Sequence, residues 1–533
     1  MITFKQKALF SAIAGVGALA AAGAANAVYV NHDGLGQALI YPYYTARDGN
    51  ATLLSVVNTT NNAKIVKVRF LEGKNSKEVL DFNLFLSPFD VWTGAVLPAT
   101  SAAAALLPGY SNPGVDALGG GMLVTADRSC TNPKIPAAGA AFRNFAYSGD
   151  TTVAANQSMD RSMEGYLEMI EMAEIISTST LWSDVKHTKA NNWTPACSLV
   201  SNASVNANAA ALTAPTGGLF GAGTLLNAGG GTNTGYDAMA LNDFWATGTG
   251  SQFTQSGDVS PNLGSATGKT SVVQNGQLIY LTPWTAGRDA VSATIMHAKV
   301  MNEYAHTGDG VVGTDWVMTM PTKRFYVNST VALPPFQSPW NGKTSKDDFG
   351  VMDTDREEFS ATSVSTDDFS PGPTGSAADC TGTSQNSSSI PLQTVVASLC
   401  YEANILGFGK IQSSAKSNVL GSTNFFNLVT AVQNSGNAVN APGNEGGWAA
   451  VTFPVTTSGA HQLVANSATS ATGATAVVNL AAPTAAAAQY SVVTYGGLPV
   501  IGFAIVQAKK TGSDRYASSY GHKYSVSVTV AAN

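Results

Sequence analysis

Acidic side chains crowd one short stretch of the sequence, and carboxylates at this density are the first groups that could do chemistry. They lie between residues 347 and 368, at Asp347, Asp348, Asp353, Asp355, Glu357, Glu358, Asp367 and Asp368. Hard oxygen ligands in a flexible segment suit Ca²⁺, which takes roughly six to eight oxygens. The stretch is therefore a candidate calcium site, with ligands drawn from Asp347, Asp348, Asp353, Asp355 and Glu357.

The spacing of these carboxylates does not match an EF-hand. Counting from Asp353, the sixth position is Glu358 where the motif needs Gly, and the twelfth is Val364 where it needs Glu. The alternative is a solvated acidic loop that Arg356 and the lysines around residue 345 partly neutralise. The sequence favours the loop, and Ca²⁺ is the single cofactor that it suggests.

A second group of carboxylates lies in residues 163–176, at Glu164, Glu168 and Glu171. The Leu, Met and Glu content favours a helix, although the segment is short and contains Gly165. On a helix the three glutamates share a face, where paired carboxylates suit acid–base chemistry. On a strand Glu171 points away from the other two. The favoured interpretation is an exposed polar face without a catalytic role.

No familiar catalytic motif joins these groups. The six histidines are scattered and form no HExxH, and the chain has no GxSxG, GxxxxGK[ST] or strand-borne GxGxxG sequence. A triad can still assemble from distant residues, so these absences lower the odds of an enzyme without excluding one. We expect a protein that is not an enzyme.

Four cysteines occur, at Cys130, Cys197, Cys380 and Cys400. An even number in an oxidising compartment favours two disulfides, and three connectivities are open. We predict that sequence neighbours pair, Cys130 with Cys197 and Cys380 with Cys400. No CxxC pair is present, which argues against a zinc or redox site.

Residues 1–27 are expected to be a secretory signal peptide. Lys5 and Lys7 precede an apolar stretch, and Ala25-Asn26-Ala27 fits signal peptidase. We therefore expect a secreted protein of the cell surface or extracellular space, with the periplasm as the other location. No other apolar run is long enough to cross a membrane, so no transmembrane span is expected in the mature chain.

The composition indicates a polar surface with few charges. Charged residues make up 12% of the chain, with 28 basic and 34 acidic residues and a net charge of -6. A nucleic-acid binder needs clustered Lys and Arg to neutralise phosphates. We expect no nucleic-acid partner.

Alternating apolar residues predict strands at both ends of the chain. Residues 52–58, 66–70 and 80–86 are separated by short polar turns and predict a three-strand antiparallel meander with one buried face. In the second of these strands, Lys67 and Arg69 point away from that face. Residues 500–506 and 524–530 predict strands near the C-terminus. Residues 313–319 and 321–327 look like two strands flanking a proline.

The predicted fold class is mainly β, with antiparallel β-sandwich domains, long Ala/Gly/Ser/Thr-rich loops and a few short helices. The expected division is residues 28–130 as an N-terminal β-sandwich-like domain and 131–345 as a central β-rich region with long loops. An acidic, Ser/Thr-rich loop segment at 346–395 and a C-terminal β domain at 396–533 follow.

Several segments resemble those of large, uncharacterised secreted or cell-surface proteins of Gram-negative bacteria. They are GQALIYPYYTARDG, LLSVVNTTNNAKIVKVRFLEGKNSKEVLDFNLFLSPFDVW, GTDWVMTMPTKRFYV and GGLPVIGFAIV. The resemblance implies a location and carries no catalytic motif. The composition is also similar to that of surface-layer proteins, although four cysteines depart from that pattern.

Two functions stay open at this point. The first is a non-enzymatic cell-surface structural or interaction protein, surface-layer-like or adhesin-like, whose partners are copies of itself or other surface components. The second is a secreted hydrolase or saccharide-binding protein, for which Trp193, Trp340 and Tyr110 in polar stretches offer flat faces to sugars.

Overall fold

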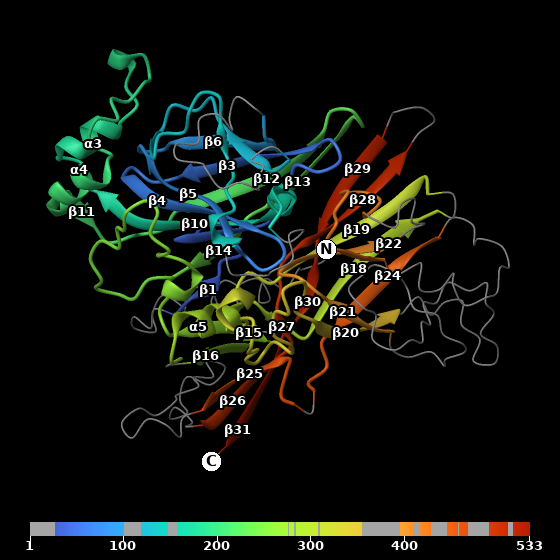
Figure 1. Ribbon diagram of the computed structural model, residues 1–533. Coiled ribbons are helices and arrows are strands. Elements are labelled where there is room, and N and C mark those ends of the chain that lie inside the picture. The colour runs from blue at the N-terminus through green and yellow to red at the C-terminus, as the bar shows by residue number, and fades with distance from the viewer. Residues whose placement is uncertain are drawn as a thin grey trace, which may run out of the picture.

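The chain forms a mainly β protein with several antiparallel sheets, as the sequence predicts. The computed structural model describes residues 27–100, 119–147, 157–274, 277–281, 284–307, 310–353, 395–408, 416–427, 445–456, 458–466, 490–509 and 515–532. Figure 1 shows the blue and green strands gathered in one part and the yellow to red strands in another beside it.

Two sheets make the first part, which we call the N-terminal sandwich. The larger is eight-stranded, and its strands are β1 (Tyr29–Val30), β14 (Met239–Asn242), β2 (Ala38–Thr45), β10 (Glu164–Ile175), β4 (Ala63–Glu72), β5 (Glu78–Leu86) and β8 (Cys130–Asn132), with β11 (Leu212–Thr213) beside β10. The smaller contains β13 (Thr232–Asp237), β12 (Leu219–Asn227), β3 (Asn50–Asn58), β6 (Val91–Pro98), β7 (Gly121–Val124) and β9 (Ala140–Ala141). Apolar side chains from both sheets pack between them.

The second part contains two five-stranded sheets and a three-stranded sheet. The first has β21 (Val395–Leu399), β20 (Asp347–Asp353), β24 (Glu445–Thr452), β18 (Lys299–His306) and β30 (Lys523–Ser525). The second has β23 (Phe425–Asn427), β22 (Ala403–Phe408), β19 (Val312–Thr319), β28 (Phe503–Lys509) and β29 (Arg515–Gly521). The third has β25 (Gln462–Asn466), β26 (Tyr490–Gly496) and β31 (Ser527–Ala532), and two strand pairs are β15 (Thr270–Gln274) with β16 (Gln277–Leu281) and β17 (Met296–His297) with β27 (Leu498–Pro499).

Helices are few and short. The α-helices are α3 (Thr180–Val185), α4 (Asn202–Ala207) and α5 (Gly287–Thr294). The 3-10 turns are η1 (Phe145–Tyr147), η3 (Met159–Met163), η4 (Lys189–Asn191), η5 (Ala209–Ala211), η6 (Leu263–Ser265) and η7 (Lys323–Phe325). In Figure 1, α3 and α4 lie at the outer end of the N-terminal sandwich, while α5 lies near β1 and β16.

The predicted meander is wrong in its pairing, although all three of its strands exist. β4 and β5 form a hairpin in the eight-stranded sheet, whereas β3 pairs with β6 and β12 in the six-stranded sheet. The turn between β3 and β4 therefore carries the chain from one sheet to the other. The half-buried character predicted for β4 is also wrong, because Lys67 and Arg69 are buried.

The structure decides two other local predictions. Residues 163–176, which the sequence left open between helix and strand, contain strand β10, because pairing with β2 and β4 along its length outweighs helix propensity. The segment after Pro321 contains the 3-10 turn η7 where a second strand was expected. β19, which precedes it, matches the prediction.

The expected domain boundaries do not coincide with the sheets. β10 and β12, from beyond residue 130, lie in the centre of the N-terminal sandwich, and β18 and β19 belong to sheets of the second part. Residues 346–395 were expected to be a loop, yet they begin with strand β20. One apolar core cluster joins Val317 and Ile505 to side chains of the N-terminal sandwich, so the two parts share a core.

The disulfide prediction is confirmed for Cys130 and Cys197, which are bonded. Cys400 is buried beside β21, and Cys380 lies outside the described residues. Residues 1–26 of the expected signal peptide, residues 1–27, also lie outside them, and Ala27 and Val28 are buried. No helix among the described residues is long and apolar enough to cross a membrane.

Candidate functional site

Strand β10 brings four glutamates into the interior of the protein. Glu164, Glu168 and Glu171 have no exposed surface, and Glu174 is 7% exposed. The prediction that Glu164, Glu168 and Glu171 form an exposed polar face is therefore wrong. Both faces of the eight-stranded sheet are covered by apolar clusters, and each of these carboxylates meets a basic side chain.

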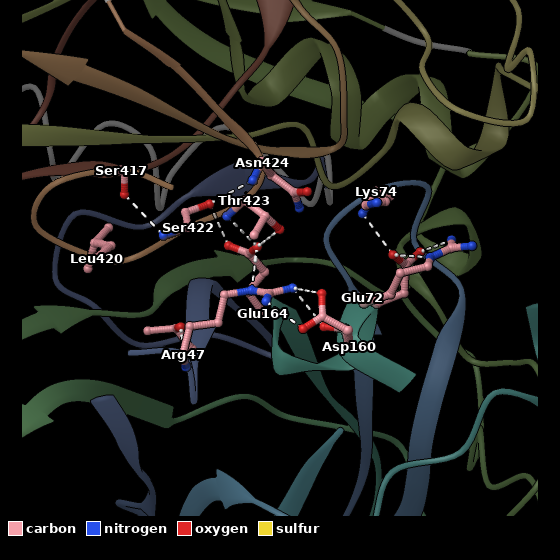
Figure 2. A network of polar contacts seen from close by, with 12 residues as sticks. Arg47, Glu72, Lys74, Asp160, Glu164, Ser417, Leu420, Ser422, Thr423 and Asn424 are labelled. Carbon is pink, nitrogen blue, oxygen red and sulfur yellow. Dashed lines mark hydrogen bonds and ion pairs between the residues drawn. The ribbon is translucent and has the colours of Figure 1, made fainter. Parts of the chain in front are cut away.

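Glu164 is the most heavily bonded of the four. Its Oε1 accepts hydrogen bonds from Arg47 Nε over 2.7 Å and from the backbone N–H and hydroxyl of Thr423 over 3.1 and 3.0 Å. Its Oε2 accepts from the hydroxyls of Tyr43 over 2.7 Å and Ser422 over 2.6 Å. Figure 2 shows Arg47 and residues 422–423 reaching this carboxylate from opposite sides. Five donors use its available lone pairs.

Arg47 extends the network to a second carboxylate. Its Nη1 and Nη2 each donate to Asp160 over 2.9 Å, in the bidentate geometry that favours arginine. Burial alone lowers the pKa of Arg47, but the charges of Glu164 and Asp160 outweigh this effect and raise it. The guanidinium is therefore a permanent cation held between two anions.

A second buried pair lies beside the first. Glu72 accepts from Arg161 Nε over 3.1 Å and Nη2 over 2.9 Å, and from the backbone N–H groups of Lys74 and Lys77 over 2.8 and 3.0 Å. Burial alone raises the pKa of Glu72, but Arg161 and these N–H groups outweigh it and lower the pKa. Glu72 is thus ionised and, like Glu164, fully engaged (Figure 2).

The rest of β10 repeats the pattern. Lys64 Nζ donates to Glu171 over 2.7 Å and to Glu174 over 2.9 Å. Burial raises the pKa of Glu171 despite the opposing charge of Lys64. Glu168 binds Arg324 and lies 3.8 Å from Arg69. The basic partners come from β4 and from η7, which are far apart in the sequence.

Residues 416–424 form a segment that is hydrogen-bonded to two buried carboxylates, Glu164 of β10 and Asp315 of β19. Ser422 and Thr423 bind Glu164, and Asp315 Oδ2 accepts the backbone N–H groups of Val419 and Leu420 over 3.3 and 2.9 Å. Both apolar side chains enter the core of the N-terminal sandwich. Burial raises the pKa of Asp315 to about 6. The segment thus docks the second part of the chain against β10.

The arrangement of these carboxylates suits joining structural elements better than catalysis or metal binding. A general acid or base must exchange a proton with a substrate, and a metal ligand must offer a lone pair. The oxygens of Glu164 and Glu72 are already occupied, and neither pair lines the two clefts of about 580 and 570 Å³ that open elsewhere on the N-terminal sandwich. Charge-assisted hydrogen bonds of this kind stabilise and orient the elements they join.

The predicted calcium ligands are placed only in part. Asp347 is fully buried and binds Lys323 Nζ over 2.7 Å, while Asp348 accepts from Ser398 and Gln337. Asp353 ends β20, and Asp355 and Glu357 lie outside the described residues. The described part of the chain contains no group of three His, Cys, Asp or Glu side chains that could hold a metal. Calcium stays a prediction.

The aromatic residues that the sequence offered as sugar platforms differ in exposure. Trp193 is 58% exposed, whereas Trp340 is buried, at 3%. Tyr110 lies outside the described residues. Sequence reasoning missed Arg47, Glu72 and Asp315. The signal available was charge complementarity, since the basic residues of β4 are opposite in charge to the acidic residues of 164–174.

Comparison with models of protein families, with curated proteins and with solved structures gives no match.

Proposed function

We propose that this protein is an exported, non-enzymatic protein of the cell surface, with a structural or interaction role. The observation that carries the proposal is the saturated ionic network around Glu164, which joins β2, η3, β10 and residues 416–424. The most concentrated chemistry of the described chain thus fixes the two parts of the protein to each other. A rigid, durable scaffold is what a role outside the cell requires.

The distribution of charge supports the same role. Six basic and nine acidic side chains are buried among the described residues, in a chain that is only 12% charged. The outward face of the six-stranded sheet instead carries large apolar side chains, with Leu53 and Phe220 each 41% exposed and Val91 46% exposed. Large exposed apolar side chains on one face favour contact with other molecules. The Cys130–Cys197 disulfide suits an oxidising compartment.

Localisation tests the proposal. Immunogold labelling and cell fractionation should find the protein on the cell exterior, and a variant lacking residues 1–27 should stay in the cytoplasm. Labelling confined to the soluble periplasm would contradict a surface role. Hydrolysis of a polysaccharide or peptide panel by the purified mature protein would contradict the non-enzymatic assignment and favour a secreted hydrolase.

A further inference from the structure

A cleft of about 570 Å³ opens on the N-terminal sandwich, away from the ionic network. One wall is the start of β5, from Glu78 to Phe82, and the other is residues 133–146, which follow β8. Its volume falls within the range of about 300–1,000 Å³ typical of small-molecule sites. The cleft is therefore large enough to hold a small ligand.

The inner surface of the cleft is apolar. Val79 and Phe82 are buried, and Ile135 packs against the core of the N-terminal sandwich. At the rim Phe145 is 54% exposed, and the guanidinium of Arg143 lies 5.5 Å from the centre of its ring. This pair presents a flat surface with a positive charge on it, which suits a ligand that is itself flat and anionic.

The charges of the two walls are not equivalent. Glu78 binds Arg69 over 2.6 Å and Asp81 binds Lys67 over 2.6 Å, so a buried cation neutralises each carboxylate from behind. Across the described chain, neither Arg143 nor Lys134 has a carboxylate within ion-pair distance. The net charge offered to a ligand is therefore positive.

We propose that this cleft binds a carboxylate-bearing sugar, such as a uronic acid residue of an extracellular polysaccharide. Arg143 and Lys134 hold the carboxylate, in the manner that guanidinium and ammonium groups bind anions. Phe145 stacks on the sugar ring, and the remaining lone pairs of Glu78 and Asp81 accept hydrogen bonds from hydroxyls. An acidic peptide lacks those hydroxyls and brings further negative charge towards the two carboxylates. The inference rests on the proposed function, because it names the partner of an interaction protein.

Calorimetry on the mature full-length protein tests the proposal, with trigalacturonic acid as the probe. Its methyl ester is the matched ligand, since it keeps the sugar and removes the charge. Arg143→Gln and Phe145→Ala are each expected to raise Kd at least about tenfold, equivalent to about 1.4 kcal/mol. The controls are Arg128→Gln and Phe89→Ala, which change exposed residues outside the cleft and should leave Kd unchanged.

Each alternative outcome overturns part of the proposal. No heat with the acid overturns the binding site, and equal affinity for the ester overturns the requirement for charge. Equal affinity for triglutamate shows that an anion suffices and overturns the sugar assignment. Unchanged affinity in both cleft variants, with wild-type circular dichroism, moves the site elsewhere. Surface labelling of cells that produce Phe145→Ala tests the proposed function separately. A wild-type protein that reaches the cell surface but does not bind the probe contradicts the cleft proposal and leaves the surface role intact.

Discussion

Glu164 illustrates how a carboxylate becomes stable in the interior of this protein. Taking an ionised group out of water is unfavourable unless opposite charges and donors replace the solvent. Here Arg47 supplies the charge, and Tyr43, Ser422 and Thr423 supply the remaining donors. Removing the charge of one member leaves the other donors aimed at a weaker acceptor. The network is therefore sensitive to single substitutions.

Glu164→Gln is expected to reduce the free energy of unfolding by about 3 kcal/mol, the lower end of the range for breaking a buried ion pair. The amide keeps the shape of the side chain but removes the charge that opposes Arg47. Urea unfolding followed by fluorescence measures the loss. Glu303→Gln is the matched control, because Glu303 is exposed on β18, and it should change stability by no more than about 0.5 kcal/mol. Equal stability of the two variants would show that the charge of Glu164 does not stabilise the fold.

Asp315→Asn should change the pH dependence of stability. Burial raises the pKa of Asp315 to about 6 in the folded protein, from 3.8 in an unfolded chain. Between these values the folded state holds the extra proton, so stability is greatest at low pH and falls as pH rises through the window. Asparagine does not titrate. From pH 4 to pH 7 the variant should gain about 2 kcal/mol relative to wild type. Thermal unfolding at both pH values measures this gain, and a constant difference would contradict the assignment.

At the scale of elements, β10 decides the fold of the N-terminal sandwich. It pairs with β2 on one side and β4 on the other, and all twelve of its residues are buried. Gly165 lies where the neighbouring strand comes closest, since a Cβ at that position would lie 2.0 Å from the carbonyl oxygen of Leu71. The glycine that weakened the helix prediction is thus required by strand packing.

Gly165→Ala should destabilise the protein by about 3 kcal/mol or more, because the added methyl group overlaps backbone atoms that cannot move independently. Soluble yield and the urea midpoint measure the effect. Gly235→Ala on β13 is the control, since its Cβ would lie 3.6 Å from the nearest atom, an ordinary contact. The control should stay within about 1 kcal/mol of wild type. A tolerated alanine at position 165 would mean that β10 and β4 can separate without loss.

At the scale of the whole molecule, the two parts of the chain share their cores. One apolar cluster combines side chains of β2 and β10 with those of β18, β19 and β24, and a second adds Val419 and Leu420 to the N-terminal sandwich. The disulfide links β8 to the loop before α4, close to a third cluster around Leu181 and Val205. We therefore expect the parts to unfold together.

The double variant Cys130→Ala/Cys197→Ala should lose about 4 kcal/mol of stability, because the bond closes a loop with a sequence separation of 67 residues. Differential scanning calorimetry should still show one transition, at a lower temperature. Reducing agent should lower the wild-type midpoint at least as far. Two separate transitions in the variant would contradict the shared core.

The sequence by itself determined the fold class and the strands with clear alternation, whereas it left three disulfide connectivities open, among them the observed Cys130–Cys197 pair. The fold class and these strands follow from local properties, because the side-chain period and the turn residues can be read from neighbouring positions. Only the tertiary structure decided which sheet each strand joins and where the glutamates of β10 lie. Arg47 and Glu164 are separated by 117 residues, and no local pattern relates them. The carboxylate of Glu164 and the guanidinium of Arg47 pair because an unpaired charge in the protein interior is strongly destabilising.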